Sequence, residues 1–352
     1  LFLTSLTFTL ISLVFYLGTM LDITKTIMRF YIKYILIVCV ILLPVTYGLA
    51  PQTFSRLVLP IITLLLLAPY IKRKWIFFLV SLLVLSVLSN PSFRANLIKI
   101  GLSTLILGIF YFKAFRSTIV KRISFISVVC LPIILVVLGL FYDFNIFNEL
   151  SANDDLAYEV QKIGQGELQT QNNDTRTFLY LEVLNDLANN DAFLFGKSPS
   201  QGYRSFAFTD TGGAMNGIRY STEVNYLNIL LYYGIIGLLL NIALVLHVAY
   251  LGVFRSKNKL AIMFGFLLLS KYLLSFIEEF TKYDFNFYFF WLIMGLVSSK
   301  RFRAMNEHQV KVWVKSIFSE RSSRRIYLNN YHSVPNEIQK KREFIGVKTI
   351  KY

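Results

Sequence analysis

Three arginines stand out in the polar stretch from residue 143 to 222, because the stretch is otherwise rich in Asp and Glu. A guanidinium group stays charged and can donate two parallel hydrogen bonds, which suits it to anionic oxygens. The stretch ends as an apolar run begins, and Glu223 and Asn225 stand at that junction. We therefore expect a cation, a carboxylate and an amide to meet at the edge of an apolar segment. The arginines are Arg176, Arg204 and Arg219.

These residues also have purely structural explanations. The insert carries eleven acidic and five basic residues, so each arginine can pair with an acid of the same loop. Glu223 can simply cap the N-terminus of the helix that follows it. If Glu223 is instead partly desolvated at the mouth of that helix, its pKa would rise and it could accept a proton. The two roles of Glu223 are compatible.

Composition places these residues in a membrane protein. Hydrophobic residues make up 55% of the 352 residues and charged residues only 16%, and the mean hydropathy is +0.55. Such values are typical of multi-span membrane proteins and argue against a soluble fold. The net charge of +16 does not indicate a nucleic-acid partner, because the basic residues lie in short gaps between apolar runs and in the C-terminal tail.

We expect an all-α, polytopic helical bundle with about nine or more spans and one large extracytoplasmic loop. Every second gap between apolar runs is basic, as the positive-inside rule predicts for cytoplasmic gaps, and this alternation puts the acidic insert outside. With nine spans and a cytoplasmic tail, Leu1 would lie outside, so we expect at least one earlier span. The predicted spans are 1–20, 31–50, 57–71, 75–89, 97–112, 123–142, 224–254, 260–277 and 285–299.

This topology divides the chain into four parts. In the last part, apolar residues recur at helical spacing between Val310 and Phe318, which predicts a helix lying on the anionic cytoplasmic leaflet. A disordered basic tail is the alternative. The parts are 1–142 with about six spans, the extracytoplasmic loop 143–222, 223–299 with about three spans, and the basic cytoplasmic tail 300–352.

A few polar residues lie inside the predicted spans. Lys271 stands one to two turns before Glu278, which predicts an internal ion pair or, alternatively, a contact with glycan or phosphate. Lys99 is placed to snorkel towards the outer surface or to join a phosphate-binding group. The three histidines are scattered and the two cysteines lie in apolar runs, so we expect neither a metal site nor a cofactor.

Two segments of the insert lead into its final apolar run. A helical pattern from Phe178 to Leu187, with Asp174 or Thr175 as N-cap, puts Arg176 in the first turn of a helix. The turn-rich sequence FLFGKSPSQGY follows at 193–203. Residues 223–240, EVNYLNILLYYGIIGLLL, then form a polar entry into a span.

An arginine ahead of an amphipathic helix, FLFGKSPSQGY, a variable loop, a polar pair and YLNILLYYGIIGLLL together resemble the O-antigen polymerase and O-antigen ligase superfamily. The match covers about 176–240 as motif and the remainder only as topology. The resemblance implies a GT-C-like multi-pass bundle in the bacterial inner (cytoplasmic) membrane, with the large loop periplasmic. It also implies glycosyl transfer from an undecaprenyl-diphosphate-linked glycan, without metal or nucleotide sugar.

The resemblance implies a diphosphate contact for Arg176, which matches the family's arginine, and the other residues named at the start become candidates beside it. Glu223 and Arg176 would be catalytic, as base and diphosphate contact, and the diphosphate and glycan would be bound by Arg176, Arg204, Arg219, Asn225 and Tyr226. The ligase branch usually shows a histidine followed by asparagine where this chain has Glu223 and Asn225. That departure favours a polymerase, which moves the growing glycan from undecaprenyl diphosphate to the acceptor sugar of another lipid-linked repeat unit.

Three other functions stay open. A ligase would transfer the glycan to lipid A-core, and a lipid-linked oligosaccharide flippase or transporter would need a polar pathway through the spans. An acyltransferase would need a histidine at the outer face, and His247 falls near the cytoplasmic half of its span. Expected partners are the undecaprenyl-diphosphate-linked oligosaccharide, membrane lipids, a chain-length regulator and a flippase, with no nucleic acid. O-antigen, capsule and exopolysaccharide are equally compatible products.

Overall fold

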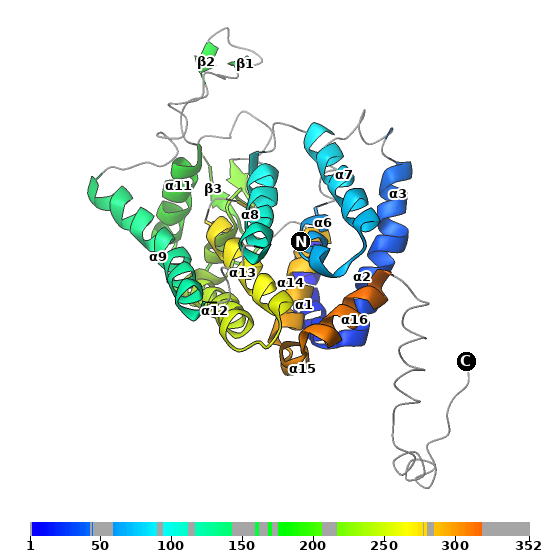
Figure 1. The fold of residues 1–352 in the computed structure, drawn as a ribbon. Helices are drawn as coiled ribbons and strands as arrows, with labels where there is room; N and C mark the ends of the chain where they lie inside the picture. Colours follow the sequence, from blue (N-terminus) through cyan, green and yellow to red (C-terminus); the bar gives the residue numbers. More distant parts are fainter. Residues whose placement is uncertain are drawn as a thin grey trace, which may run out of the picture.

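The computed structural model describes residues 2–42, 44, 59–89, 94–111, 117–142, 159–161, 168–170, 175–205, 217–276, 278–279 and 285–318. Within them the chain is mostly helical, and the only strands among these residues form two small antiparallel ribbons in the polar insert (Figure 1). β1 (Glu159–Gln161) pairs with β2 (Leu168–Thr170), and β3 (Tyr203–Arg204) pairs with β4 (Ile218–Arg219).

Most helices of the described chain coincide with predicted apolar runs, because long apolar segments satisfy their backbone groups best as helices. They are α1 (Phe2–Thr19), the π-helix η1 (Tyr31–Ile35), α3 (Leu36–Ile41), α7 (Arg73–Ser89), α8 (Arg94–Tyr111), α9 (Thr118–Tyr142), α12 (Asn225–Phe254), α13 (Lys259–Leu274) and α14 (Phe285–Ser298). α2 (Leu21–Phe30) instead lies in the predicted gap between the runs 1–20 and 31–50. In the insert, α11 (Thr175–Asn189) is the predicted amphipathic helix.

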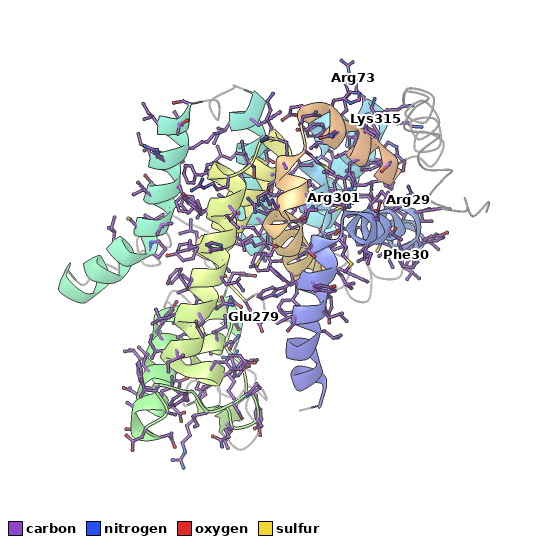
Figure 2. All side chains as sticks on the ribbon, turned by 90° about the horizontal axis from the view of Figure 1, so that it is seen from below. Arg29, Phe30, Arg73, Glu279, Arg301 and Lys315 are labelled. Carbon is purple, nitrogen blue, oxygen red and sulfur yellow. The ribbon has the colours of Figure 1, made fainter. Side chains whose placement is uncertain are left out.

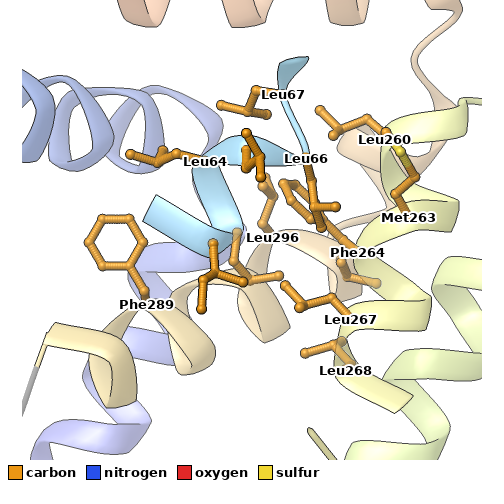
Figure 3. Close-up of a cluster of buried hydrophobic side chains, with 14 of the residues drawn as sticks. Leu64, Leu66, Leu67, Leu260, Met263, Phe264, Leu267, Leu268, Phe289 and Leu296 are labelled. Atoms are coloured by element: carbon orange, nitrogen blue, oxygen red, sulfur yellow. The ribbon is translucent and has the colours of Figure 1, made fainter. Parts of the chain in front are cut away.

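The predicted span 57–71 is wrong over its described part. It folds as α6 (Ile61–Leu65) followed by the 3-10 turn η2 (Ala68–Tyr70). Five helical residues extend only about 7.5 Å, far less than a bilayer core. Figure 3 shows Leu64, Leu66 and Leu67 of this segment in one buried cluster with Phe264 of α13 and Leu296 of α14. The segment is apolar because it fills the core of the bundle.

Among the described residues, α12 is the one helix both long and apolar enough to cross a membrane. Shorter apolar stretches are helical at Leu10–Thr19, Ile98–Phe110 and Phe285–Ser298. The described chain is thus a mostly helical protein with one candidate membrane span.

Two pairs of glycines bring helices into backbone contact. α13 packs against α12, α14, α8 and α9, and α1 packs against α14. A Cβ added to Gly295 of α14 would lie 2.0 Å from the carbonyl oxygen of Phe15, and one on Gly18 of α1 would lie 2.3 Å from that of Leu292. The α12 and α13 backbones meet in the same way at Gly252 and Gly265. Small residues at helix crossings are typical of helix pairs in membranes.

The tail begins with two helices docked on the bundle. α15 (Lys300–Ala304) leads into α16 (Glu307–Phe318), which confirms the predicted helix. Its apolar face is buried against the protein, and the indole Nε1 of Trp313 donates to the carbonyl oxygen of Leu21 at 3.3 Å. The expectation that this face lies on the lipid leaflet is therefore wrong. The rest of the predicted tail, 319–352, lies outside the described residues.

The glycine contact between α1 and α14 makes a prediction for stability. We expect Gly295→Ala to lower the melting temperature, because the new methyl group must displace the α1 backbone and overpacking costs about 1–3 kcal/mol. Gly101→Ala in α8 is the matched control, since a Cβ there meets no atom within 4 Å. It should be neutral or stabilising, because alanine favours helix over glycine by up to about 1 kcal/mol. Melting curves in detergent showing the same shift for both variants would contradict this packing.

Candidate functional site

α11 and the start of α12 form the core of the folded insert. Leu179, Val183 and Leu187 recur every four residues along α11, so they share one face and are fully buried. They pack with Tyr203 against the first part of α12, contributed by Val224, Leu227, Leu230, Leu231 and Tyr232. The first turns of α12 thus belong as much to this cluster with the insert as to the predicted span 224–254. Arg176 lies in the first turn of α11 as predicted, and its side chain lies outside the described residues.

Two carboxylates on α11 hold the segment that follows the helix. Asp186 accepts a hydrogen bond from Lys197 Nζ at 2.7 Å and another from the backbone N–H of Arg204 at 3.3 Å. Glu182 accepts one from the hydroxyl of Ser205 at 2.9 Å. Both carboxylates are buried, where an unpaired charge is costly. They therefore fix the position at which β3 begins.

α12 is broken at Gly234, and the segment 193–198 repairs the break. Gly234 has φ of 65° and ψ of −169°, a backbone conformation open essentially to glycine alone. Before the break, the carbonyl oxygens of Leu231 and Tyr232 accept from the N–H groups of Lys197 at 2.7 Å and Ser198 at 3.3 Å. After it, the N–H groups of Ile235 and Ile236 donate to Phe193 at 2.9 Å and Leu194 at 3.4 Å. We call these four bonds the α12 clamp.

The N-terminus of α12 is joined to the C-terminal end of α13. The N–H groups of Asn225 and Tyr226 donate to the carbonyl oxygens of Glu278 and Ser275, both at 3.1 Å. Each helix end thereby satisfies backbone groups that the other leaves open. The amide of Asn225 also donates to Ser275 Oγ at 3.2 Å. This junction fixes where the residues just before α12 emerge.

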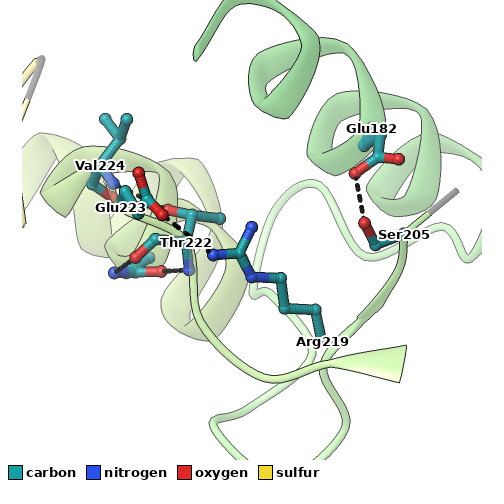
Figure 4. Close-up of polar contacts among 7 residues, drawn as sticks. Glu182, Ser205, Arg219, Thr222, Glu223 and Val224 are labelled. Atoms are coloured by element: carbon teal, nitrogen blue, oxygen red, sulfur yellow. Dashed lines mark hydrogen bonds and ion pairs between the residues drawn. The ribbon is translucent and has the colours of Figure 1, made fainter. Parts of the chain in front are cut away.

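Arg219 and Glu223 lie side by side at that point. Arg219 Nη2 donates to Glu223 Oε1 at 3.4 Å, and Figure 4 shows the guanidinium directed towards this carboxylate. The Glu223 side chain is 53% exposed and that of Arg219 15%. Thr222 and Asn228 exchange two hydrogen bonds next to Glu223, which fixes the backbone here. The N-cap of α12 is Val224, so the side chain of Glu223 faces Arg219 instead of capping the helix.

The ribbon separates two of the predicted arginines. Tyr203 is paired with Arg219 and Arg204 with Ile218, and directly paired residues share one face of a ribbon. Arg204 therefore lies on the face opposite to Arg219, and it is exposed. The expected grouping of these two cations in one place does not occur. Gly212, Gly213 and Asn216, in the predicted loop between the strands, lie outside the described residues.

Tyr203 provides a hydroxyl beside Arg219. Burial raises the pKa of Tyr203 to about 12, although the neighbouring Arg219 acts in the opposite direction. The hydroxyl consequently stays protonated at neutral pH and can donate a hydrogen bond. The face of the ribbon that carries Arg219 thus places a cation next to a half-exposed carboxylate, with the buried hydroxyl of Tyr203 beside the cation.

A cavity of ≈ 390 Å³ lies among α1, α12, α13 and α14. Its wall is mostly apolar, and Asn225, Tyr226 and Lys271 contribute to it together with Ser275 and Tyr272. Two predicted binding residues, Asn225 and Tyr226, therefore line it, only two residues after Glu223. The cavity can hold the apolar part of an amphiphile between the helices, and Lys271 in its wall provides a cation for an anionic part.

Comparisons with protein-family models, with curated proteins and with solved structures find no match for this chain. The assignment of function therefore depends on the geometry of the site and on the motif resemblance.

Sequence reasoning missed the clamp and one ion pair. Lys99 Nζ of α8 donates to Glu278 Oε1 at 3.1 Å, and both side chains are largely buried. From the sequence, Lys271 was the predicted partner of Glu278, because those two residues are close in the chain. Gly196 lies in a turn-rich segment and Gly234 in an apolar segment. Their local sequences do not indicate that the two backbones, nearly 40 residues apart in the chain, lie in contact.

The clamp predicts a local effect of Gly234→Ala. Its Cβ would lie 2.2 Å from the carbonyl oxygen of Leu194, so the clamp must open. We expect faster hydrogen exchange at the amides of Lys197 and Ile235 and a loss of stability beyond the roughly 1–3 kcal/mol of an alanine forced into this glycine-only backbone conformation. Gly217→Ala is the control, because Gly217 also has positive φ while a Cβ there meets no atom within 4 Å. Unchanged exchange at both amides in Gly234→Ala would refute the clamp.

Proposed function

We propose that the chain is a polytopic inner-membrane polymerase of lipid-linked oligosaccharide repeat units, with its catalytic loop on the periplasmic side. The observation that carries this proposal is the Arg219–Glu223 pair, which stands two residues before Asn225 and Tyr226 in the wall of a mostly apolar cavity. A lipid diphosphate sugar needs an apolar site for its lipid, a cation for its diphosphate and a base for the acceptor hydroxyl.

The surface of the helices supports a membrane around the bundle. Large apolar side chains face outward on several helices, such as Phe77 on α7 at 76% exposure and Leu240 on α12 at 67%. Apolar surface of this kind is stable in lipid and unfavourable in water. The 20 residues of α12 after Gly234 extend about 30 Å, the thickness of a bilayer core. The glycine contacts between helices fit the same environment.

Charge supports the proposed orientation. The N-terminal end of α12 carries the folded insert, and its C-terminal end adjoins α15 and α16, where Lys257 N–H donates to the Arg303 carbonyl at 2.8 Å. In Figure 2 the labelled Arg73, Arg301 and Lys315 lie away from the end at which the green insert is drawn. A basic end opposite an acidic insert is the arrangement expected of a cytoplasmic and a periplasmic face.

In the proposed reaction, Glu223 takes the proton of an acceptor sugar hydroxyl. The hydroxyl oxygen forms the new bond to the anomeric carbon of the growing glycan as the bond from that carbon to the diphosphate breaks. The bonding electrons leave with undecaprenyl diphosphate, and Arg219 and Lys271 stabilise the charge that develops there. Arg176, whose helix packs on the start of α12, remains a candidate for the same role.

Arg219 and Arg204 offer a matched test on one ribbon. We expect Arg219→Ala to reduce long-chain surface glycan roughly 100-fold, the usual effect of removing a group that stabilises transition-state charge. Arg204→Ala, on the opposite face, should leave chain length unchanged, and Arg176→Ala should resemble Arg219→Ala. The measurement is a gel of surface glycan from a deletion strain complemented with each variant at equal membrane levels. Normal polymer in Arg219→Ala would remove this residue from the proposed site.

Glu223→Gln keeps the size of the side chain and removes the base. We expect a loss of chain extension of about 10²–10⁴-fold, as for removal of a general base. Binding of the lipid-linked donor should persist, because Arg219 and the cavity remain.

In the deletion strain itself, single repeats attached to their final acceptor would support a polymerase. Unattached lipid-linked polymer would indicate a ligase, and precursor retained on the cytoplasmic face a flippase.

A further inference from the structure

A second pocket lies beside α16, at the end of the bundle away from the folded insert. Its volume is ≈ 580 Å³, and its wall carries three cations, Arg29, Lys33 and Lys74. No Asp or Glu is among the described residues that line it. Figure 2 shows Arg29 on the side of the molecule that also carries the labelled Arg73 and Lys315. The apolar part of the wall consists of Ile32, Ile37, Trp75, Phe78, Ile317 and Phe318; together these nine residues are called the basic pocket.

Three elements hold the basic pocket in shape. Arg29 Nη2 donates to the carbonyl oxygen of Ser316 in the last turn of α16, which ties α2 to α16. The ring of Trp75 on α7 lies 5.2 Å from that of Phe318 and 5.9 Å from that of Phe78, measured between centroids. Lys33 lies on η1, and single π-helical turns inside helices are frequent at functional sites. Lys33 and Lys74 are exposed, so they are accessible to a ligand.

We infer that the basic pocket binds the phosphodiester headgroup of an anionic phospholipid, with the upper part of an acyl chain against the aromatic side. Three cations without a carboxylate select an anion, and the adjoining aromatic and aliphatic wall selects an amphiphile over a free ion. Basic pockets between helices on the cytoplasmic side of membrane proteins bind such lipids. The inference rests on the proposed membrane placement of the chain and is independent of the proposed reaction.

The composition of the remaining tail argues against its binding in the basic pocket. Residues 319–352, which continue from Phe318, contain eight basic and three acidic residues. A segment with this excess of positive charge is repelled by three cations. An anionic lipid, present at high local concentration on the cytoplasmic leaflet, has the complementary charge.

The test uses the full chain in detergent with equal amounts of phosphatidylglycerol and phosphatidylcholine, and native mass spectrometry counts the lipids retained. We expect the wild type to retain phosphatidylglycerol preferentially and Lys33→Gln/Lys74→Gln to retain about tenfold less. Lys72→Gln/Arg73→Gln is the control, because it removes two charges from exposed neighbours of Lys74 that do not line the basic pocket. It should behave as the wild type.

Three results would overturn the inference. These are equal retention in both double variants, equal retention of the two lipids by the wild type, and displacement of the lipid by millimolar inorganic phosphate, which would indicate a site for free anions. Melting curves without added lipid should agree for both variants, and the single Lys33→Gln variant replaces the double one if they differ. Glycan extension plays no part in this readout, so failure of the proposed reaction would leave the result unaffected.

Discussion

The α12 clamp is the interaction on which the arrangement of this molecule depends. A helix broken inside an apolar protein exposes carbonyl and N–H groups that cost several kcal/mol each when they lack partners. Here the partners come from 193–198, a segment that the chain reaches only after α11 has turned it back. The break in α12 and the segment 193–198 of the insert are therefore joined by the four backbone bonds of the clamp. Glycines at 196 and 234 are required because the two backbones approach too closely for any side chain.

Continuous apolar runs were sufficient to predict most helices, because a long apolar segment has few alternatives to a helix. The same signal failed for 57–71, since a run of leucines in the core of a bundle looks like a run of leucines facing lipid. It also failed at Gly234, because a single glycine in an apolar run is compatible with a continuous helix. What decides both cases is tertiary: the neighbours of α6 in the core and the arrival of 193–198 at α12. Neither neighbour is visible from local sequence.

Part of the site followed from the sequence for a similar reason. Arg219, Glu223, Asn225 and Tyr226 are so close in the chain that their proximity in space needed little tertiary information. The position of Arg204 needed the register of β3 on β4, and a shift of one residue would have put it beside Arg219. Lys271 lines the cavity because α13 packs beside α12. The spacing of residues within α13 alone could not predict this packing.

The junction behind the cavity explains how the insert and the bundle can act together. Glu278 accepts from the backbone of Asn225 with its carbonyl and from Lys99 with its carboxylate, so α8, α12 and the end of α13 meet at one residue. Removing one partner of a buried pair leaves an uncompensated charge and typically costs about 3–5 kcal/mol. The wall of the cavity is consequently held on the same framework as Glu223, two residues before Asn225. In the proposed reaction, a substrate with its lipid in the cavity would therefore lie against the same framework that holds Glu223 and its partner Arg219, as the positioning of two reacting groups requires.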